Sequence, residues 1–127
     1  MAKHDYYEQG QLTDVAYLVL VSLTRPCHGY LIMMKVEEMT KGRASIGPAS
    51  LYTTLKKLSQ ADLIYLQGDV DNKKIYCITN KGVEALKVEI EKREQYAAIG
   101  KEALNLYREP SEWENTNTGL DTALHMA

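Results

Sequence analysis

The sequence has few cysteines and histidines, and this scarcity limits the chemistry that it can support. Its 127 residues contain two cysteines and three histidines. Two isolated cysteines provide neither a disulfide framework nor the paired spacing of a zinc site, and the histidines lie far apart in the chain. We therefore expect no metal and no other cofactor, and a fold held together by an apolar core.

Long apolar runs are also missing. The longest, residues 15–23, is far shorter than a membrane-spanning helix and is interrupted by tyrosine and serine. It lacks the preceding basic region of a secretory signal. We expect a cytoplasmic protein that makes no contact with a membrane and keeps both cysteines as reduced thiols.

Recognisable catalytic patterns are absent as well. The sequence has no recognisable phosphate-binding loop and no recognisable pair of carboxylates on a pocket wall. It also has no set of serine, histidine and aspartate typical of a nucleophilic site. We predict that the protein is not an enzyme.

What the sequence does have is an uneven distribution of charge. The net charge is only −2, yet residues 41–81 carry seven basic and three acidic side chains, while both flanking segments carry more acids than bases. The local potential, not the net charge, decides what a surface attracts. The middle third of the chain is therefore the candidate anion-binding region.

Two helices are predicted before this basic region. Residues 15–23 follow the N-cap signal of Thr13 and end before Pro26, although the dense valines and leucines there also permit a strand. Residues 30–39 have the pattern of a second helix. Its apolar side chains are expected to fill the core: Tyr30, Met33, Met34, Val36 and Met39.

A third helix, residues 48–60, lies within the basic region. Pro48 suits its first position, and Leu51, Leu55 and Leu58 recur at the spacing of one helical face. The opposite face is polar and basic. Such a helix packs on the protein through its apolar face and presents short polar and cationic side chains on the other face. These side chains have the chemistry needed to contact DNA.

A β-hairpin and a long helix are predicted after it. The strands are residues 63–66 and 73–78, joined by a turn at residues 67–72. The long helix covers residues 79–107, with apolar residues recurring every three or four positions. This spacing is typical of a helix that pairs with another helix.

The order of elements predicts a winged helix-turn-helix followed by a long C-terminal dimerisation helix, a mainly α fold with a β-hairpin. We expect a DNA-binding domain with an N-terminal arm at residues 1–79, a dimerisation helix at 80–109 and a flexible tail at 110–127. The seam of the dimerisation helix is predicted from its spacing as Val83, Leu86, Ile90, Ala97 and Leu104.

Four short motifs in this order resemble the PadR family of bacterial transcription regulators. They are His-Gly-Tyr at 28–30, Gly-Pro-Ala-Ser-Leu-Tyr at 47–52, Ala-Asp-Leu-Ile at 61–64 and Lys-Lys-Ile-Tyr at 73–76. The single C-terminal helix resembles the smaller subfamily. The resemblance implies a winged helix, a homodimer formed through the last helix, and repression of nearby genes that a small molecule relieves.

The resemblance also suggests which residues contact DNA. The family positions fall on Ser50, Tyr52 and Thr53 with Lys57 in the third helix, and on Lys73 and Lys74 in the wing. Lys56 joins them as a further phosphate contact expected from its place on the basic face.

Two departures from the family pattern stand out. The predicted wing tip carries Asp69 and Asp71 where many relatives have glycine and arginine, which disfavours contact with phosphate. Arg93 occupies the position of a tryptophan in the multidrug-binding members, and would pair with Glu89 or with an anionic ligand. The expected walls of an effector pocket for a small aromatic compound are Val15, Leu18, Arg93, Tyr96 and Ile99.

Together these features predict a homodimeric, ligand-responsive repressor that binds a pseudo-palindromic operator of double-stranded DNA. The rival interpretation is a winged-helix module that binds another protein and not DNA. The acidic wing tip and the negative net charge are the features that favour the rival.

Overall fold

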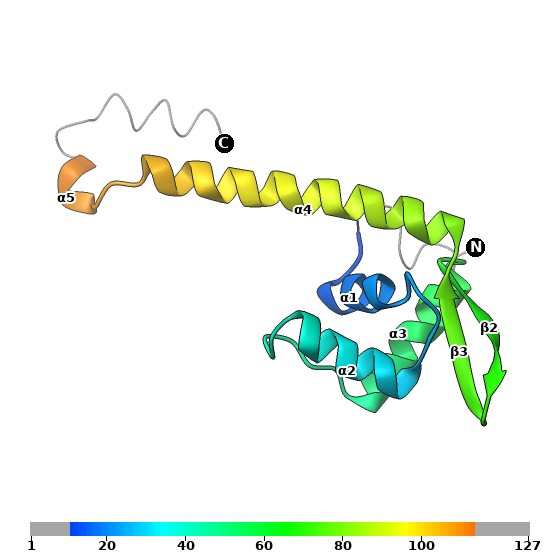
Figure 1. Cartoon of the computed structure of the whole chain (residues 1–127). Helices are drawn as coiled ribbons and strands as arrows, with labels where there is room; N and C mark the ends of the chain where they lie inside the picture. The colour runs from blue at the N-terminus through cyan, green and yellow to red at the C-terminus, as the bar shows by residue number, and fades with distance from the viewer. Residues whose placement is uncertain (1–10, 114–127) are drawn as a thin grey trace. The chain divides into compact units, whose positions relative to one another are not determined.

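The structure, a computed structural model, describes residues 11–113 (Figure 1). The chain forms two compact units, the first ending at Arg93 and the second beginning at Glu94. Among the described residues, no helix combines the length and the apolar character needed to cross a membrane.

Three helices build most of the first unit and confirm the predicted pattern. They are α1 (Asp14–Ser22), α2 (Gly29–Met39) and α3 (Pro48–Gln60). The Thr13 side chain accepts a hydrogen bond of 3.1 Å from the backbone N–H of Ala16, which caps α1. Pro48 occupies the start of α3, where its missing N–H leaves no hydrogen bond unmade.

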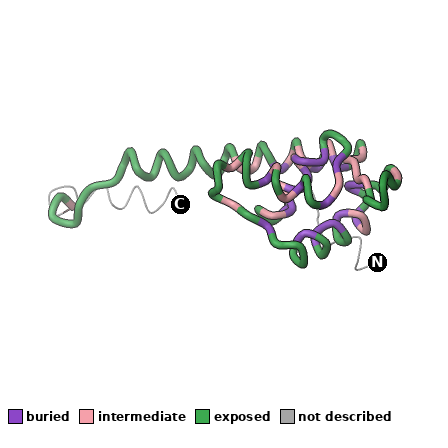
Figure 2. The backbone as a smooth tube through the Cα atoms, turned by 60° about the horizontal axis from the view of Figure 1, so that its bottom comes forward, coloured by how far each residue is buried: buried purple, intermediate pink, exposed green. Residues whose placement is uncertain are grey.

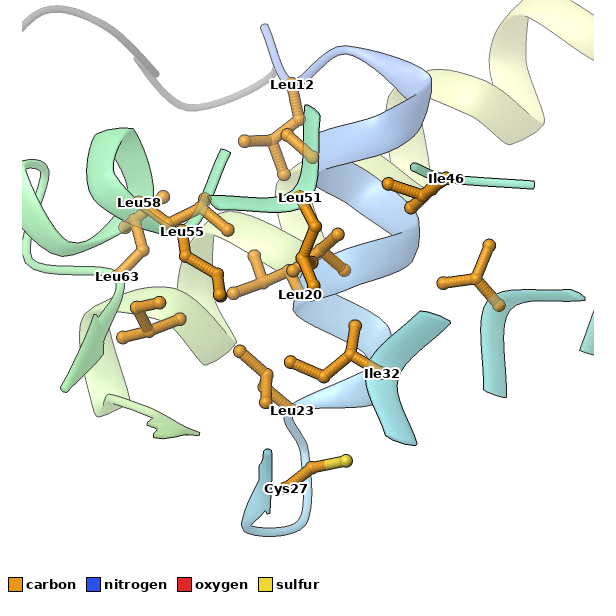
Figure 3. Close-up of a cluster of buried hydrophobic side chains, with 14 of the residues drawn as sticks. Leu12, Leu20, Leu23, Cys27, Ile32, Ile46, Leu51, Leu55, Leu58 and Leu63 are labelled. Atoms are coloured by element: carbon orange, nitrogen blue, oxygen red, sulfur yellow. The ribbon is translucent and has the colours of Figure 1, made fainter. Parts of the chain in front are cut away.

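The three helices pack on one another around a leucine-rich core. Leu51, Leu55 and Leu58 of α3 are all buried, as their spacing predicted. Figure 3 shows Leu51 pointing into the interior beside Leu20 of α1 and Ile32 of α2. This buried face fixes the orientation of α3 and leaves its other face toward solvent.

The predicted core face of α2 is partly wrong. Ile32 and Val36 are fully buried, whereas Tyr30, Met34 and Met39 are exposed and Met33 is half-buried. The helix begins at Gly29, so the positions that face α1 and α3 are Gly29, Ile32 and Val36. These positions follow the three-to-four residue period of a helix. Met33 borders this stripe and packs partly against the core, whereas Met34 and Met39 lie outside it.

A three-stranded antiparallel sheet completes the winged helix. Its order is β1 (Cys27–His28), β3 (Lys73–Ile78), β2 (Ile64–Val70). The sequence did not predict β1, which pairs with Ile75 and Tyr76 of β3. The β-hairpin of β2 and β3 extends from the helical part as a narrow wing (Figure 1).

The wing tip differs from its prediction. The expected turn at residues 67–72 is mostly strand, because β2 continues to Val70. The turn is the pair Asp71 and Asn72, both with positive φ (52° and 63°), a conformation that suits a two-residue hairpin turn. A register shift between Leu66 and Gly68 shows that the residues near the glycine form a bulge in the strand, not the turn.

The long helix α4 (Asn80–Leu106) begins in the first unit. The Thr79 hydroxyl accepts a hydrogen bond of 2.9 Å from the N–H of Gly82 and donates one of 2.7 Å to the carbonyl of Asp62. A side chain at Gly82 would collide with the backbone carbonyl of Leu63, so the glycine permits close packing of α4. Ala85 and Glu89 are also buried.

The second unit contains the rest of α4 and the short helix α5 (Pro110–Trp113). Residues 94–106 are exposed throughout (Figure 2). Residues 110–113, predicted as the start of a flexible tail, are helical, and the Trp113 indole donates a hydrogen bond of 3.1 Å to the carbonyl of Arg108. The remainder of the predicted tail, and residues 1–10 of the predicted arm, lie outside the described residues.

Candidate nucleic-acid interface

Helix α3 presents the predicted contact residues on one open face. All five are exposed. By helical periodicity Thr53, Lys56 and Lys57 lie opposite the buried leucines, and Ser50 and Tyr52 lie on the two flanks. Hydroxyl and ammonium groups on an exposed helix are able to hydrogen-bond base edges and phosphates. The structure therefore brings the predicted residues of α3 onto one surface.

The two predicted wing lysines lie just after the hairpin turn. Lys73 and Lys74 begin β3 and are exposed. In the ladder Lys73 pairs with Val70, and Lys74 pairs with Asp69. Because Asp69 is directly opposite Lys74, the positive potential of the wing is reduced at this position.

A cavity of about 390 Å³ joins these two regions. Its walls include Tyr52 of α3 and both wing lysines, together with His28 and Tyr30 at the start of α2. The sequence pattern did not assign His28 or Tyr30 to this surface. The available signal was the His-Gly-Tyr motif, whose central Gly29 allows close approach of Tyr52: a methyl group on Gly29 would lie 2.6 Å from the Tyr52 hydroxyl oxygen.

The predicted dimerisation residues differ in exposure along α4. Val83 and Leu86 are half-buried in the first unit, and Ile90 is 38 % exposed. Ala97 and Leu104 of the second unit are exposed, Leu104 by 77 %. An exposed leucine on a helix with other exposed apolar residues is typical of an uncovered interaction surface.

Arg93, predicted to pair with Glu89 or with a ligand, is held within the first unit. Its Nε donates a hydrogen bond of 2.7 Å to Glu89, and Nη1 donates one of 2.8 Å to Asp14. Its guanidinium also lies over the ring of Tyr17, 4.3 Å from the centroid. The pairing with Glu89 is confirmed. Together with the bonds to Asp14 and to the Leu12 carbonyl, it engages all three guanidinium nitrogens, which are the donors that an anionic ligand would need.

Glu89 is the centre of this ion-pair cluster and has no exposed surface. It accepts a hydrogen bond of 3.1 Å from the backbone N–H of Leu12 and lies 3.1 Å from the ammonium of Lys92. Burial alone would raise the pKa of Glu89, but the hydrogen bonds from Lys92, the Leu12 N–H and Arg93 hold the pKa below its ordinary value. The carboxylate is therefore ionised and tied to both the segment before α1 and the helix α4.

The other predicted effector residues belong to different units of the chain. Val15 and Leu18 of α1 are half-buried beside the core, whereas Tyr96 and Ile99 are exposed on α4. Within residues 11–113 there is no cluster of three or more side chains suited to a metal ion.

Comparison with known proteins identifies the family. The model of the PadR-like transcriptional regulators matches residues 18–88, more than half of the chain. The chain belongs to the PadR-like family of transcriptional regulators. The family consists of regulators and not of enzymes. No curated protein is similar enough to the chain to count as a match.

Solved structures agree with the PadR-like fold. A transcriptional regulator from Clostridium thermocellum has a TM-score of 0.58 at 18 % identity, with 77 % of this chain and all of that chain covered. A PadR family regulator from Eggerthella lenta DSM 2243 has a TM-score of 0.57 at 24 % identity, covering 71 % and 76 %. The protein smu.1704 from Streptococcus mutans UA159 has a TM-score of 0.59 at 25 % identity, covering 81 % and 98 %.

Proposed function

We propose that this PadR-like regulator is a repressor that binds double-stranded DNA as a homodimer. The observation that carries the proposal is the two-faced structure of α3, whose leucine face is buried while its hydroxyl and lysine face is open. Two copies would present two such helices to successive major grooves of a pseudo-palindromic operator. The protein would act in the cytoplasm, on DNA of the same cell.

Each part of the surface has a distinct role in this proposal. Ser50 and Thr53 carry short hydroxyl groups suited to base edges, while Lys56, Lys57 and the wing lysines supply attraction to phosphates. The domain division at residues 79/80 belongs to the same proposal: the winged helix contacts DNA and the helix after it pairs the two copies.

The test of the α3 surface is a Lys57→Ala variant, with Lys101→Ala as the matched control. Both changes remove one exposed lysine from a helix, but Lys101 lies on α4, far along the chain from α3. Lys57→Ala is expected to weaken binding to any duplex and to reduce the slope of log affinity against log salt by about one. Equal affinities and equal slopes for the two variants would contradict the role of α3.

The proposal includes release of DNA by a small aromatic effector. Tyr96 and Ile99 are exposed on α4, and Val15 and Leu18 are half-buried on α1; these four residues and Arg93 are the ones expected to contact the effector. A ligand that favours a spacing of the two DNA-binding units unsuited to the operator would lower the affinity. Phenolic acids and aromatic cations should be titrated against the DNA-bound protein; no release by either class would count against this part.

A second candidate function, binding to another protein instead of DNA, is favoured by one observation. Asp69 lies opposite Lys74, and Asp71 forms the wing tip. If the wing approaches DNA, Asp69→Asn should strengthen binding by a few-fold because an acid is removed from the phosphate-facing surface. Unchanged DNA affinity in Asp69→Asn, together with a weak response to Lys57→Ala, would favour the protein-binding module.

A further inference from the structure

Two side chains of α4 hold the backbone of Leu12, just before α1, from both sides. The Leu12 N–H donates a hydrogen bond of 3.1 Å to the Glu89 carboxylate, and the Leu12 carbonyl accepts one of 3.3 Å from Arg93. Glu89 and Arg93 lie one helical turn apart and are joined by a hydrogen bond of 2.7 Å. Because hydrogen bonds weaken steeply when they are misaligned, Leu12 cannot shift along α4 without losing contacts on both sides.

The start of α1 is attached to the same guanidinium. Arg93 donates a hydrogen bond of 2.8 Å to Asp14, and its guanidinium lies 4.3 Å from the centroid of the Tyr17 ring. A planar guanidinium forms hydrogen bonds and ring contacts in fixed directions. The contacts of Arg93 therefore restrict the angle between α1 and α4 as well as their distance.

Helix α4 has a second attachment near its beginning, where Gly82 packs closely on the backbone carbonyl of Leu63. Glu89 is the last buried residue of α4 and lies about two turns further on, roughly 10 Å along the axis. Between them Ala85 is buried and Leu86 packs against the core, but such apolar contacts are not directional. Two separate attachments determine the direction of a helix, whereas the first alone would leave a pivot.

We propose that Glu89 and Arg93 are positioning residues that fix the direction of α4 on α1 and thereby determine which half-site spacing the dimer accepts. The inference rests on the proposed function, in which α4 pairs two copies. The predicted seam residues Leu86 and Ile90 lie on the same segment of α4 as the ion pair. A change in the direction of this segment would change the separation of the two α3 helices. A buried ion pair adds little net stability over apolar residues of equal volume, but its directional bonds suit this role.

The variant for the first test is Arg93→Met, with Ile32→Val as the control. Methionine keeps an apolar side chain beside Tyr17 but has no N–H donors. Glu89 retains the ammonium of Lys92 and the backbone N–H before α1, so the variant should fold. Ile32→Val truncates a buried side chain of α2 and lowers stability without touching the ion pair. The control therefore separates a loss of stability from a loss of positioning.

The measurement is affinity for a series of duplexes whose half-sites, taken from the operator that the unaltered protein selects from random duplexes, are moved apart or together one base pair at a time. Each step separates the half-sites and rotates one about the duplex axis, so the unaltered protein and Ile32→Val should lose about tenfold at the first step. Arg93→Met should lose only about threefold there, because a pivoting helix adapts to the new spacing. Equal losses in Arg93→Met and the unaltered protein would overturn the inference.

The second test measures positioning without DNA. A spin label is placed on the exposed face of α3 through Thr53→Cys, in a chain whose own cysteines are replaced by Cys27→Ala and Cys77→Ala. Pulsed electron resonance should give one narrow distribution of distances between the two copies, and adding Arg93→Met should broaden or shift it. An unchanged distribution would overturn the inference.

The two tests also separate this inference from the proposed function. Failure of the unaltered protein to bind any duplex, or the absence of a distance between copies, would reject the proposed function and the spacing role together. Normal binding with a spacing dependence that Arg93→Met does not alter would reject the spacing role alone.

Discussion

The two parts of α4 differ in what their side chains contact. In residues 80–93, Gly82, Ala85 and Glu89 are buried in the first unit. In residues 94–106 every side chain is exposed, including Tyr96, Ile99 and Leu104. One continuous helix thus belongs to a folded core over its first half and offers apolar surface over its second. Exposed apolar residues are therefore concentrated in the second part of α4, although Ile90 of the first part is already 38 % exposed.

The largest expected effect comes from the buried ion-pair cluster. Glu89→Ala leaves Arg93 and Lys92 without their shared carboxylate and removes the acceptor of the Leu12 N–H. Breaking a buried ion pair from one side should lower the free energy of unfolding by about 3 kcal/mol. Urea unfolding at fixed protein concentration measures this change. The exposed Glu102 provides the control: Glu102→Ala should shift stability by less than about 0.5 kcal/mol.

The next effect tests the second half of α4 as a dimer surface. Leu104→Asp should leave the fold of the single chain intact, because Leu104 is 77 % exposed. If two copies pair there, the variant buries a charge and loses an apolar contact. The dimer dissociation constant should then rise about 30-fold or more, which corresponds to about 2 kcal/mol. Sedimentation equilibrium is the measurement, and an unchanged dissociation constant would exclude Leu104 from the interface.

Two glycines give a matched comparison of the halves. At Gly82 an added methyl meets the Leu63 carbonyl, so Gly82→Ala should lower the free energy of unfolding by roughly 1–2 kcal/mol. Nothing lies near the corresponding position at Gly100. Gly100→Ala should therefore stabilise the helix by about 0.5–1 kcal/mol through propensity alone. Thermal unfolding of both variants measures the two changes in stability. Changes of the same sign would contradict the expected difference between the two parts of α4.

The smallest effect is a dependence on pH. The pKa of Glu89 is lowered in the folded protein, so its carboxylate contributes stability that is fully present above the unfolded pKa of about 4.3 and lost as pH falls through the folded value. Glu89→Gln removes this titrating group, so the free energy of unfolding should fall less steeply as the pH drops below that value. Unfolding curves of the unaltered protein and the variant, collected from neutral to acid pH, test this. An equal fall in stability in both proteins would contradict the assignment.

Much of the fold could be predicted because its signals are local. The caps at Thr13 and Thr79 and the leucine spacing of α3 each act over one or two helical turns, and the structure confirms them. The turn was predicted too long, at residues 67–72, because Gly68 resembles a turn residue. Only its last two residues, Asp71 and Asn72, form the turn, and both residue types tolerate positive φ.

The rest depends on contacts between distant segments, which periodicity does not reveal. The strand Cys27–His28 has only two residues and forms because β3 is beside it. The Glu89–Arg93 pair was visible as neighbours one helical turn apart, but the bonds of Arg93 to Asp14 and of Glu89 to Leu12 join residues more than seventy positions apart. The cavity was missed for the same reason, since its walls come from α2, α3 and the wing.

The most direct test of the central claim is binding of the unaltered protein to DNA from upstream of its own gene. Fluorescence anisotropy should be recorded with this duplex and with a random duplex over a range of salt concentrations. We predict tighter binding to the upstream duplex and a fall in affinity for both as salt increases, since lysines displace counterions from phosphates. No binding to either duplex at low salt would contradict DNA recognition by α3 and favour a protein-binding module.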